Sequence, residues 1–159
     1  MINKLNFWGS NYYNNPSIKE ETIDKAEKIL GIKLPSSFID LIKIQNSGYT
    51  KGFVFPTKIK TSWADNHVPL NVLFGIVLDG DFMDDNIMSS NYMVKEWGLP
   101  EKLILISGDG HCWIALDYRK GKTPSISWID IECNEDIKIA ENFDDFLTGL
   151  VSEEEFFDN

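Results

Sequence analysis

Apolar residues recur at helical spacing in two stretches near the start of the chain. In residues 18–30 they fall near one face of a helix, and Ser17 and Glu20 have the spacing of a capping box. Gly31 can end this helix in a left-handed conformation. A second apolar stretch covers residues 36–45 and stops at Asn46-Ser47-Gly48. The pattern predicts two amphipathic helices ahead of any strand.

Short apolar, β-branched runs bounded by turn residues follow these helices and predict strands. The runs cover residues 52–55, 68–78, 103–106, 112–118 and 126–131. Helical spacing returns at residues 87–97 and from about residue 142 to the apolar Leu150. The order predicts an α+β fold, with a mainly antiparallel central sheet and helices packed against it. Trp113 and Trp128 are expected in the core, and His67 on the surface.

Several short motifs occur in a fixed order along the chain. They are Leu30-Gly31-Ile32-Lys33-Leu34-Pro35, Asn46-Ser47-Gly48, Trp97-Gly98-Leu99-Pro100, Gly108-Asp109-Gly110, Trp113-Ile114-Ala115-Leu116-Asp117-Tyr118-Arg119 and Phe143-Asp144-Asp145-Phe146-Leu147. In order and spacing they resemble the Smi/Knr family, also called the SUKH superfamily, over residues 18–150. Ser47 stands where the family more usually has glycine. The resemblance divides the chain into an N-terminal extension, residues 1–17, and a SUKH-like domain, residues 18–159.

The resemblance implies an α+β domain with one central sheet and no shared catalytic motif. Bacterial members of the family are largely immunity proteins that neutralise polymorphic toxins, often nucleases. Fungal relatives are regulatory scaffolds in cell-wall assembly. We therefore expect an immunity protein that binds a basic toxin, and keep a non-enzymatic scaffold as the alternative. The sequence does not indicate an oligomeric state.

The charge of the chain is strongly negative and unevenly distributed. Its 159 residues fit one domain, and the formal net charge of −10 disfavours direct binding of nucleic acid. Residues 1–78 have a net charge of +3 and residues 79–159 a net charge of −13. Such asymmetry creates a field that can steer a basic partner.

The acidic half supplies the candidate residues for binding a protein. A carboxylate-rich face could fill the basic cleft of a nuclease toxin, and exposed aromatics could anchor it. The candidate acidic face comprises Asp79, Asp81, Asp84, Asp85, Asp130, Glu132, Glu135 and Asp136. The candidate aromatic anchors are Trp63 and Tyr92.

Other chemistries fit the sequence less well. Asp109, His111 and Asp117 could form a general base or share a metal, but no nucleophile or second histidine completes such a site. The acidic turn at residues 79–85 lacks the ligand order of a calcium loop, and residues 108–111 lack the lysine of a phosphate loop. We therefore predict no catalytic residue, metal site or cofactor.

The sequence also bears on where the protein is found. The N-terminus shows no secretory signal, and no apolar run approaches the roughly 20 residues that span a bilayer. Cys112 and Cys133 have neither metal-ligand nor disulfide spacing, which is typical of free thiols in a reducing compartment. We expect a cytoplasmic protein that does not contact membranes.

Overall fold

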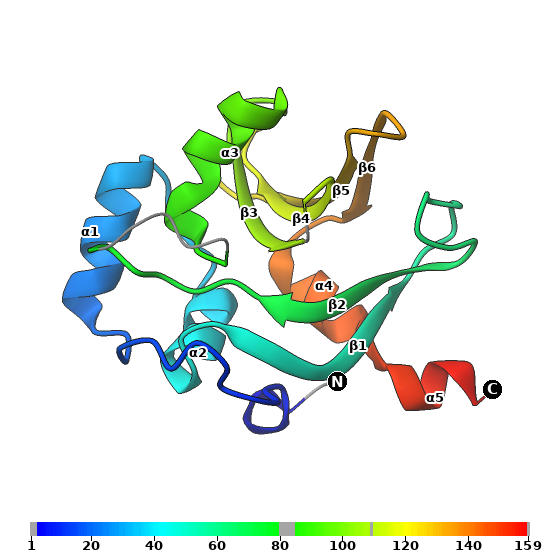
Figure 1. The fold of residues 1–159 in the computed structure, drawn as a ribbon, viewed down its shortest axis with the longest axis horizontal. Coiled ribbons are helices and arrows are strands. Elements are labelled where there is room, and N and C mark those ends of the chain that lie inside the picture. The colour runs from blue at the N-terminus through cyan, green and yellow to red at the C-terminus, as the bar shows by residue number, and fades with distance from the viewer. Residues whose placement is uncertain (1–2, 80–84, 109, 159) are drawn as a thin grey trace.

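The computed structural model describes residues 3–79, 85–108 and 110–158, and Figure 1 shows its arrangement. The helices are η1 (Lys4–Asn6), α1 (Glu20–Leu30), α2 (Ser36–Ile44), η2 (Ile87–Ser89), α3 (Ser90–Trp97), α4 (Phe143–Gly149) and α5 (Glu153–Phe157), where η marks a 3₁₀-helix. The strands are β1 (Gly48–Pro56), β2 (His67–Leu73), β3 (Leu103–Gly108), β4 (Cys112–Asp117), β5 (Ser125–Asp130), β6 (Glu135–Ala140) and β7 (Val151–Ser152). None of the helices in the described ranges is long and apolar enough to cross a membrane.

The strands form two antiparallel sheets, which confirms the predicted α+β class. One has the order β2-β1-β7 and the other the order β3-β4-β5-β6, where the family resemblance led us to expect one sheet. The two sheets meet where β2 ends beside β3. There the amide of Phe74 donates to the carbonyl of Ile106 at 2.8 Å, and Ser107 Oγ donates to the carbonyl of Val72 at 2.6 Å. These two hydrogen bonds do not extend into a strand pairing that would join the sheets, because β2 ends at Leu73.

Four short elements were not predicted, namely η1, β6, β7 and α5. In β6 the partly buried Ile137 and Ile139 alternate with charged residues, so the strand lacks an apolar run. It lies at the edge of its sheet, where charged side chains discourage pairing with other chains. The predicted Ser17 cap of α1 is wrong, because the helix begins at Glu20 and its N-cap position, Lys19, makes no side-chain cap bond. The predicted left-handed end at Gly31 is confirmed by its φ of 71°.

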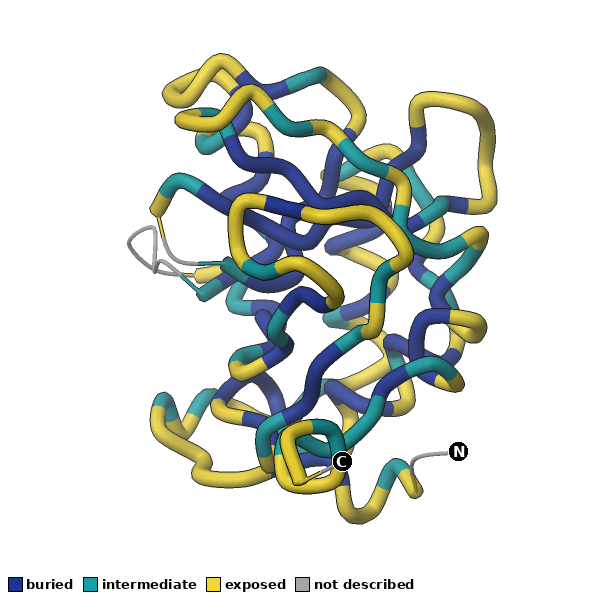
Figure 2. Tube along the Cα trace, turned by 90° about the vertical axis from the view of Figure 1, so that its right-hand side faces the viewer, coloured by how far each residue is buried: buried dark blue, intermediate teal, exposed yellow. Residues whose placement is uncertain are grey.

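The core is formed by buried residues of both sheets and of the helices, and Figure 2 shows the buried segments running through the interior of the molecule. Trp113 and Trp128 are buried as expected. The segment ahead of residue 17 also enters the core. Phe7 stacks on Phe53 with ring centroids 5.5 Å apart, and Trp8 Nε1 donates to the carbonyl of Leu41 at 2.8 Å. His67 is buried against the aromatic rings of α5, so the expectation of a surface side chain is wrong.

The family turn at residues 46–48 is held by the buried side chain of Asn46. Its Oδ1 accepts from the amide of Ile76 at 2.8 Å, and its Nδ2 donates to the carbonyls of Ile76 and Pro16, both at 2.8 Å. A side chain at Gly75 would collide with this amide, because an added Cβ would lie 2.0 Å from Asn46 Oδ1. Ser47 adopts a φ of 77°, a left-handed conformation that glycine takes up more readily than serine.

Candidate protein-binding surfaces

The loop between β1 and β2 is tied to the hairpin of β5 and β6 by Ser62. Its amide donates to Glu135 Oε1 at 2.8 Å, and its hydroxyl donates to Asp130 Oδ2 at 2.5 Å. Glu135 Oε1 also accepts from Trp128 Nε1 at 3.1 Å. These bonds hold residues 57–66 against the end of the hairpin, a contact between segments about 70 residues apart in sequence.

The Ser62 bonds bring an exposed aromatic residue and an exposed carboxylate to the same end of the molecule. Trp63, next to Ser62, is 47% exposed, and the side chain of Glu132 in the β5–β6 turn is 69% exposed. His111 Nδ1 lies 3.8 Å from the Glu132 carboxylate. We call Trp63, His111, Glu132 and Glu135 the hairpin surface. The hairpin surface thus contains two residues of the candidate acidic face, Glu132 and Glu135, and one candidate aromatic anchor, Trp63.

Asp130 lies beneath this surface and is only 1% exposed. Burial acts to raise the pKa of its carboxyl, but bonds from Ser62 Oγ and the Cys133 amide, with His111 nearby, outweigh burial and leave the pKa lowered. Asp130 is therefore ionised and holds the loop and the turn together. We leave it out of the proposed contact surface, since its carboxylate is not accessible to a partner.

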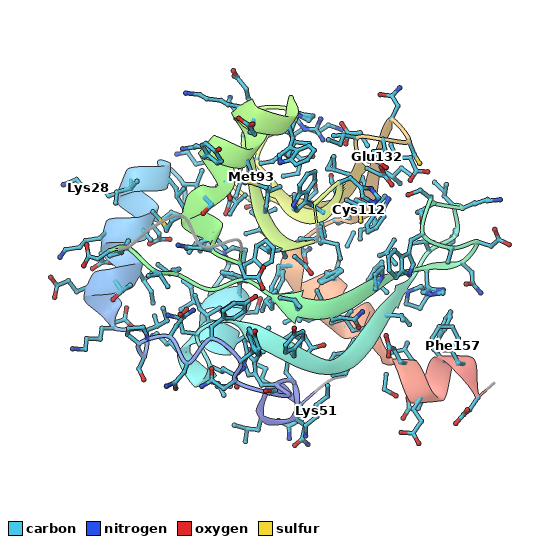
Figure 3. All side chains as sticks on the ribbon, viewed as in Figure 1. Lys28, Lys51, Met93, Cys112, Glu132 and Phe157 are labelled. Atoms are coloured by element: carbon cyan, nitrogen blue, oxygen red, sulfur yellow. The ribbon has the colours of Figure 1, made fainter. Side chains whose placement is uncertain are left out.

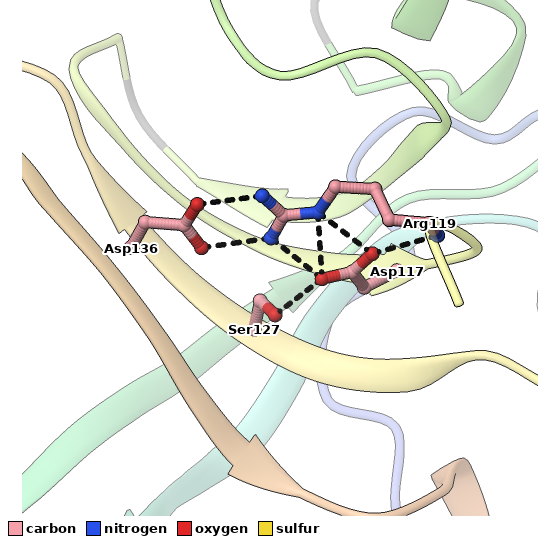
Figure 4. Close-up of polar contacts among 4 residues, drawn as sticks. All are labelled: Asp117, Arg119, Ser127 and Asp136. Carbon is pink, nitrogen blue, oxygen red and sulfur yellow. Dashed lines mark hydrogen bonds and ion pairs between the residues drawn. The ribbon is translucent and has the colours of Figure 1, made fainter.

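Asp136 is also engaged within the protein, in the cluster around Arg119 shown in Figure 4. The Arg119 guanidinium makes bonds of 2.7 and 2.8 Å to Asp136 and of 2.6 to 3.1 Å to Asp117. Ser127 Oγ donates to Asp117 at 2.9 Å. Burial acts to raise the pKa of Asp117, but these donors outweigh it and leave the pKa lowered. The cluster joins β4, the turn after it, β5 and β6, and pairs Asp136 with a cation that it shares with Asp117.

The remaining acidic candidates lie elsewhere. Asp85 accepts a hydrogen bond from the Tyr13 hydroxyl, and burial together with this bond raises the pKa of Tyr13. Asp79 is exposed, and its charge helps to raise the pKa of Lys25 on α1, so it lies near that helix. In Figure 1, α1 is at the left and the β5–β6 turn is at the upper right. Asp81 and Asp84 lie outside the described residues. Tyr92 is half-exposed on α3. The predicted acidic face is therefore divided between two parts of the molecule.

The structure separates two of the three residues weighed for catalysis. His111 and Asp117 lie at opposite ends of β4, which at about 3.3 Å per residue places them about 20 Å apart. Asp117 is bonded to Arg119, and His111 lies beside Asp130 and Glu132. Asp109 falls outside the described residues. Among the residues with described positions, no group of three histidine, cysteine or acidic side chains could hold a metal ion.

A large groove, which sequence reasoning missed, lies between α1 and α3. It encloses about 1350 Å³. Its walls are one face of each helix, Asp24 to Gly31 at helical spacing on α1 and Asn91 to Gly98 on α3. The start of β3 and Tyr118 form its floor. We call it the α1–α3 groove. Its residues come from three separate segments of the chain, residues 24–33, 91–104 and 118–122, so no local motif reveals it.

Comparison with protein families identifies the family to which the chain belongs. Residues 17–149 match the family described as the SMI1 / KNR4 family (SUKH-1). The match covers most of the chain, so the protein belongs to this family, and the resemblance noted in its sequence motifs is confirmed. No curated protein matches the chain.

Proposed function

We propose that the protein is an immunity protein that binds and neutralises a protein toxin, and that the hairpin surface makes the contact. Membership of the SMI1 / KNR4 family supports this proposal, because the family includes immunity proteins. The observation that favours the hairpin surface is that Ser62, bonded to Glu135, brings the loop of the exposed Trp63 to the hairpin whose turn carries the exposed Glu132. Tryptophan is among the commonest energetic centres of protein interfaces.

The charge of the surface favours a basic partner. A nuclease toxin holds phosphates with lysine and arginine, so its cleft attracts carboxylates. Glu132 projects from the upper right of the molecule in Figure 3 and is available to such a cleft. Because exposed charges act over about 10 Å at 0.1 M salt, association would slow as salt is raised. The proposed toxin is a nuclease, and the protein acts by occupying its active site in the cytoplasm.

The hypothesis is tested by capturing the partner and measuring what the protein does to it. The tagged protein is incubated at low salt with lysate of its own cells, and the C-terminal domain of any captured protein is then expressed alone in a test host. We expect that domain to arrest growth, to degrade nucleic acid, and to lose both activities at one equivalent of the protein. An endpoint at one equivalent indicates binding, whereas inhibition at catalytic amounts would indicate an enzyme.

A harmless partner would contradict the immunity hypothesis. If the captured proteins are regulatory and their domains do not arrest growth, the protein acts as a scaffold of the kind found among fungal relatives.

A further inference from the structure

The α1–α3 groove is lined by more cations than acids, in a protein with a net charge of −10. Its lining includes Lys28, Lys33, Lys95, Lys102, Lys122 and Arg119, against Asp24, Glu27 and Glu101. Glu27 is directed inward, since it is buried and accepts from the amide of Leu34 at 2.7 Å. The accessible charge of the groove is therefore positive.

Four of these lysines keep their charge available. Within the described part of the chain, Lys28, Lys95, Lys102 and Lys122 have no carboxylate within the 4.0 Å of an ion pair. Each is exposed. Arg119 differs, because its guanidinium is bonded to Asp117 and Asp136. The lysines come from α1, α3, the turn before β3 and the turn after β4, and so surround the groove.

Apolar side chains of the two helices and of the residues after them also line the groove. Leu30 and Ile32 are partly buried at one side, and Val94 and Leu99 are buried at the other. The volume of about 1350 Å³ exceeds the roughly 300–1,000 Å³ of small-molecule pockets. An occupant that matches this groove has acidic groups at its margins and an apolar group at its centre.

The ends of the two helices favour a peptide over a phosphate compound. α1 and α3 both end at the groove, in the left-handed residues Gly31 and Gly98. The last carbonyl groups of a helix lack intrahelical partners and carry partial negative charge. They repel a phosphate group, which brings only acceptors. A peptide brings amide donors for these carbonyls together with carboxylates for the lysines.

We propose that the α1–α3 groove binds an acidic peptide segment that carries at least one large apolar side chain. This site is separate from the hairpin surface. Lys28 is at the left of Figure 3, on α1, and Glu132 is at the upper right, on the β5–β6 turn. The two surfaces have opposite charge, so the protein can hold a basic partner and an acidic segment at the same time. The inference does not depend on the immunity hypothesis.

The test is selection from a library of random 12-residue peptides displayed on phage, with the full-length protein as the target. We expect the enriched peptides to combine aspartate or glutamate with leucine or an aromatic residue. A fluorescent copy of the best peptide is then titrated against the wild type and against the double variant Lys28→Glu/Lys95→Glu. Two attractive charges become repulsive, so we expect binding to weaken by about tenfold or more.

The matched control is Lys51→Glu/Lys58→Glu, which changes the net charge equally. Both lysines are exposed and lie outside the groove, and Lys51 is at the bottom of Figure 3. We expect this variant to bind within about threefold of the wild type, and circular dichroism checks that both variants fold. The proposal is overturned if no peptide is enriched, if the enriched peptides are not acidic, or if both variants bind alike. Displacement of the peptide by millimolar ATP would overturn it in favour of a phosphate ligand.

Discussion

Replacing Arg119 by alanine removes the centre of the cluster that joins β4, β5 and β6. Asp117, at 9% exposed, then loses the three bonds of 2.6 to 3.1 Å that it accepts from the guanidinium. It keeps the bond from Ser127 Oγ at 2.9 Å and the bond from the amide of residue 119 at 3.0 Å. In the variant the buried carboxylate of Asp117 has lost its cation and keeps only two hydrogen-bond donors.

The expected loss of stability follows from these contacts. Breaking a buried ion pair costs about 3–5 kcal/mol, and a bond to a charged group contributes about 1.5–3 kcal/mol. The two remaining donors and the exposure of the Arg119 side chain, 32%, reduce the cost. We expect a decrease of about 2 kcal/mol in the free energy of unfolding. For a chain of this size, the melting temperature falls by about 4–8 °C.

The assay is urea unfolding followed by tryptophan fluorescence, to which the buried Trp113 and Trp128 on β4 and β5 contribute. The control is Lys138→Ala, which removes an exposed ion pair with Glu141 at 2.7 Å. We expect the control to change stability by less than about 0.5 kcal/mol. If Arg119→Ala costs no more than this control, the cluster does not stabilise the hairpin and the reasoning is refuted.

Three further outcomes are expected from the protein alone. Asn46→Ala leaves the buried amide and carbonyl of Ile76 without their partners, so we expect the free energy of unfolding, measured by urea titration, to fall by about 2–3 kcal/mol. A loss below about 0.5 kcal/mol would show that water replaces the side chain. The pKa values of Asp117 and Asp130 are lowered by folding from an ordinary value of 3.8, so the stability that they contribute is complete above that value and is lost as the pH falls below it. Circular dichroism from pH 7 to 2 tests this, and Asp117→Asn removes its share of the acid sensitivity; a transition above pH 5 would contradict the assignment. Cys133 is exposed and Cys112 is buried, so we expect iodoacetamide to modify one thiol in the native protein and Cys133→Ser to abolish the reaction. Desolvation and the nearby Asp130 and Glu135 raise the pKa of Cys133, so the rate of modification rises steeply with pH.

The fold class could be predicted because its signals are local. The helices at residues 20–30 and 36–44 repeat apolar residues at helical spacing, and β4 and β5 are apolar runs between turns. β6 was missed for the opposite reason, since Glu135, Asp136 and Lys138 give it the composition of a polar turn. Its alternation is recognisable only once β5 is known to pair with it.

The candidate site could be predicted only in part, because charge counted along a chain does not reveal burial. Asp130 and Glu132 are two residues apart, yet one is enclosed by Ser62 and the other is exposed. Asp136 is paired with Arg119, 17 positions away, a cation that it shares with Asp117. The α1–α3 groove assembles residues 24–33 with residues 91–122, and no pattern in either segment indicates the other.

The most direct test of the central claim is the affinity of the captured toxin domain for three variants, measured by calorimetry at low and high salt. The variants are Trp63→Ala, Glu132→Lys and, as a control of equal charge change, Glu154→Lys on the exposed face of α5. We expect Trp63→Ala to weaken binding about 30-fold, the effect of losing an interface hot spot. Glu132→Lys is expected to weaken binding chiefly at low salt, and Glu154→Lys to bind like the wild type. Wild-type affinity in both Trp63→Ala and Glu132→Lys would contradict the account and place the toxin contact on another surface.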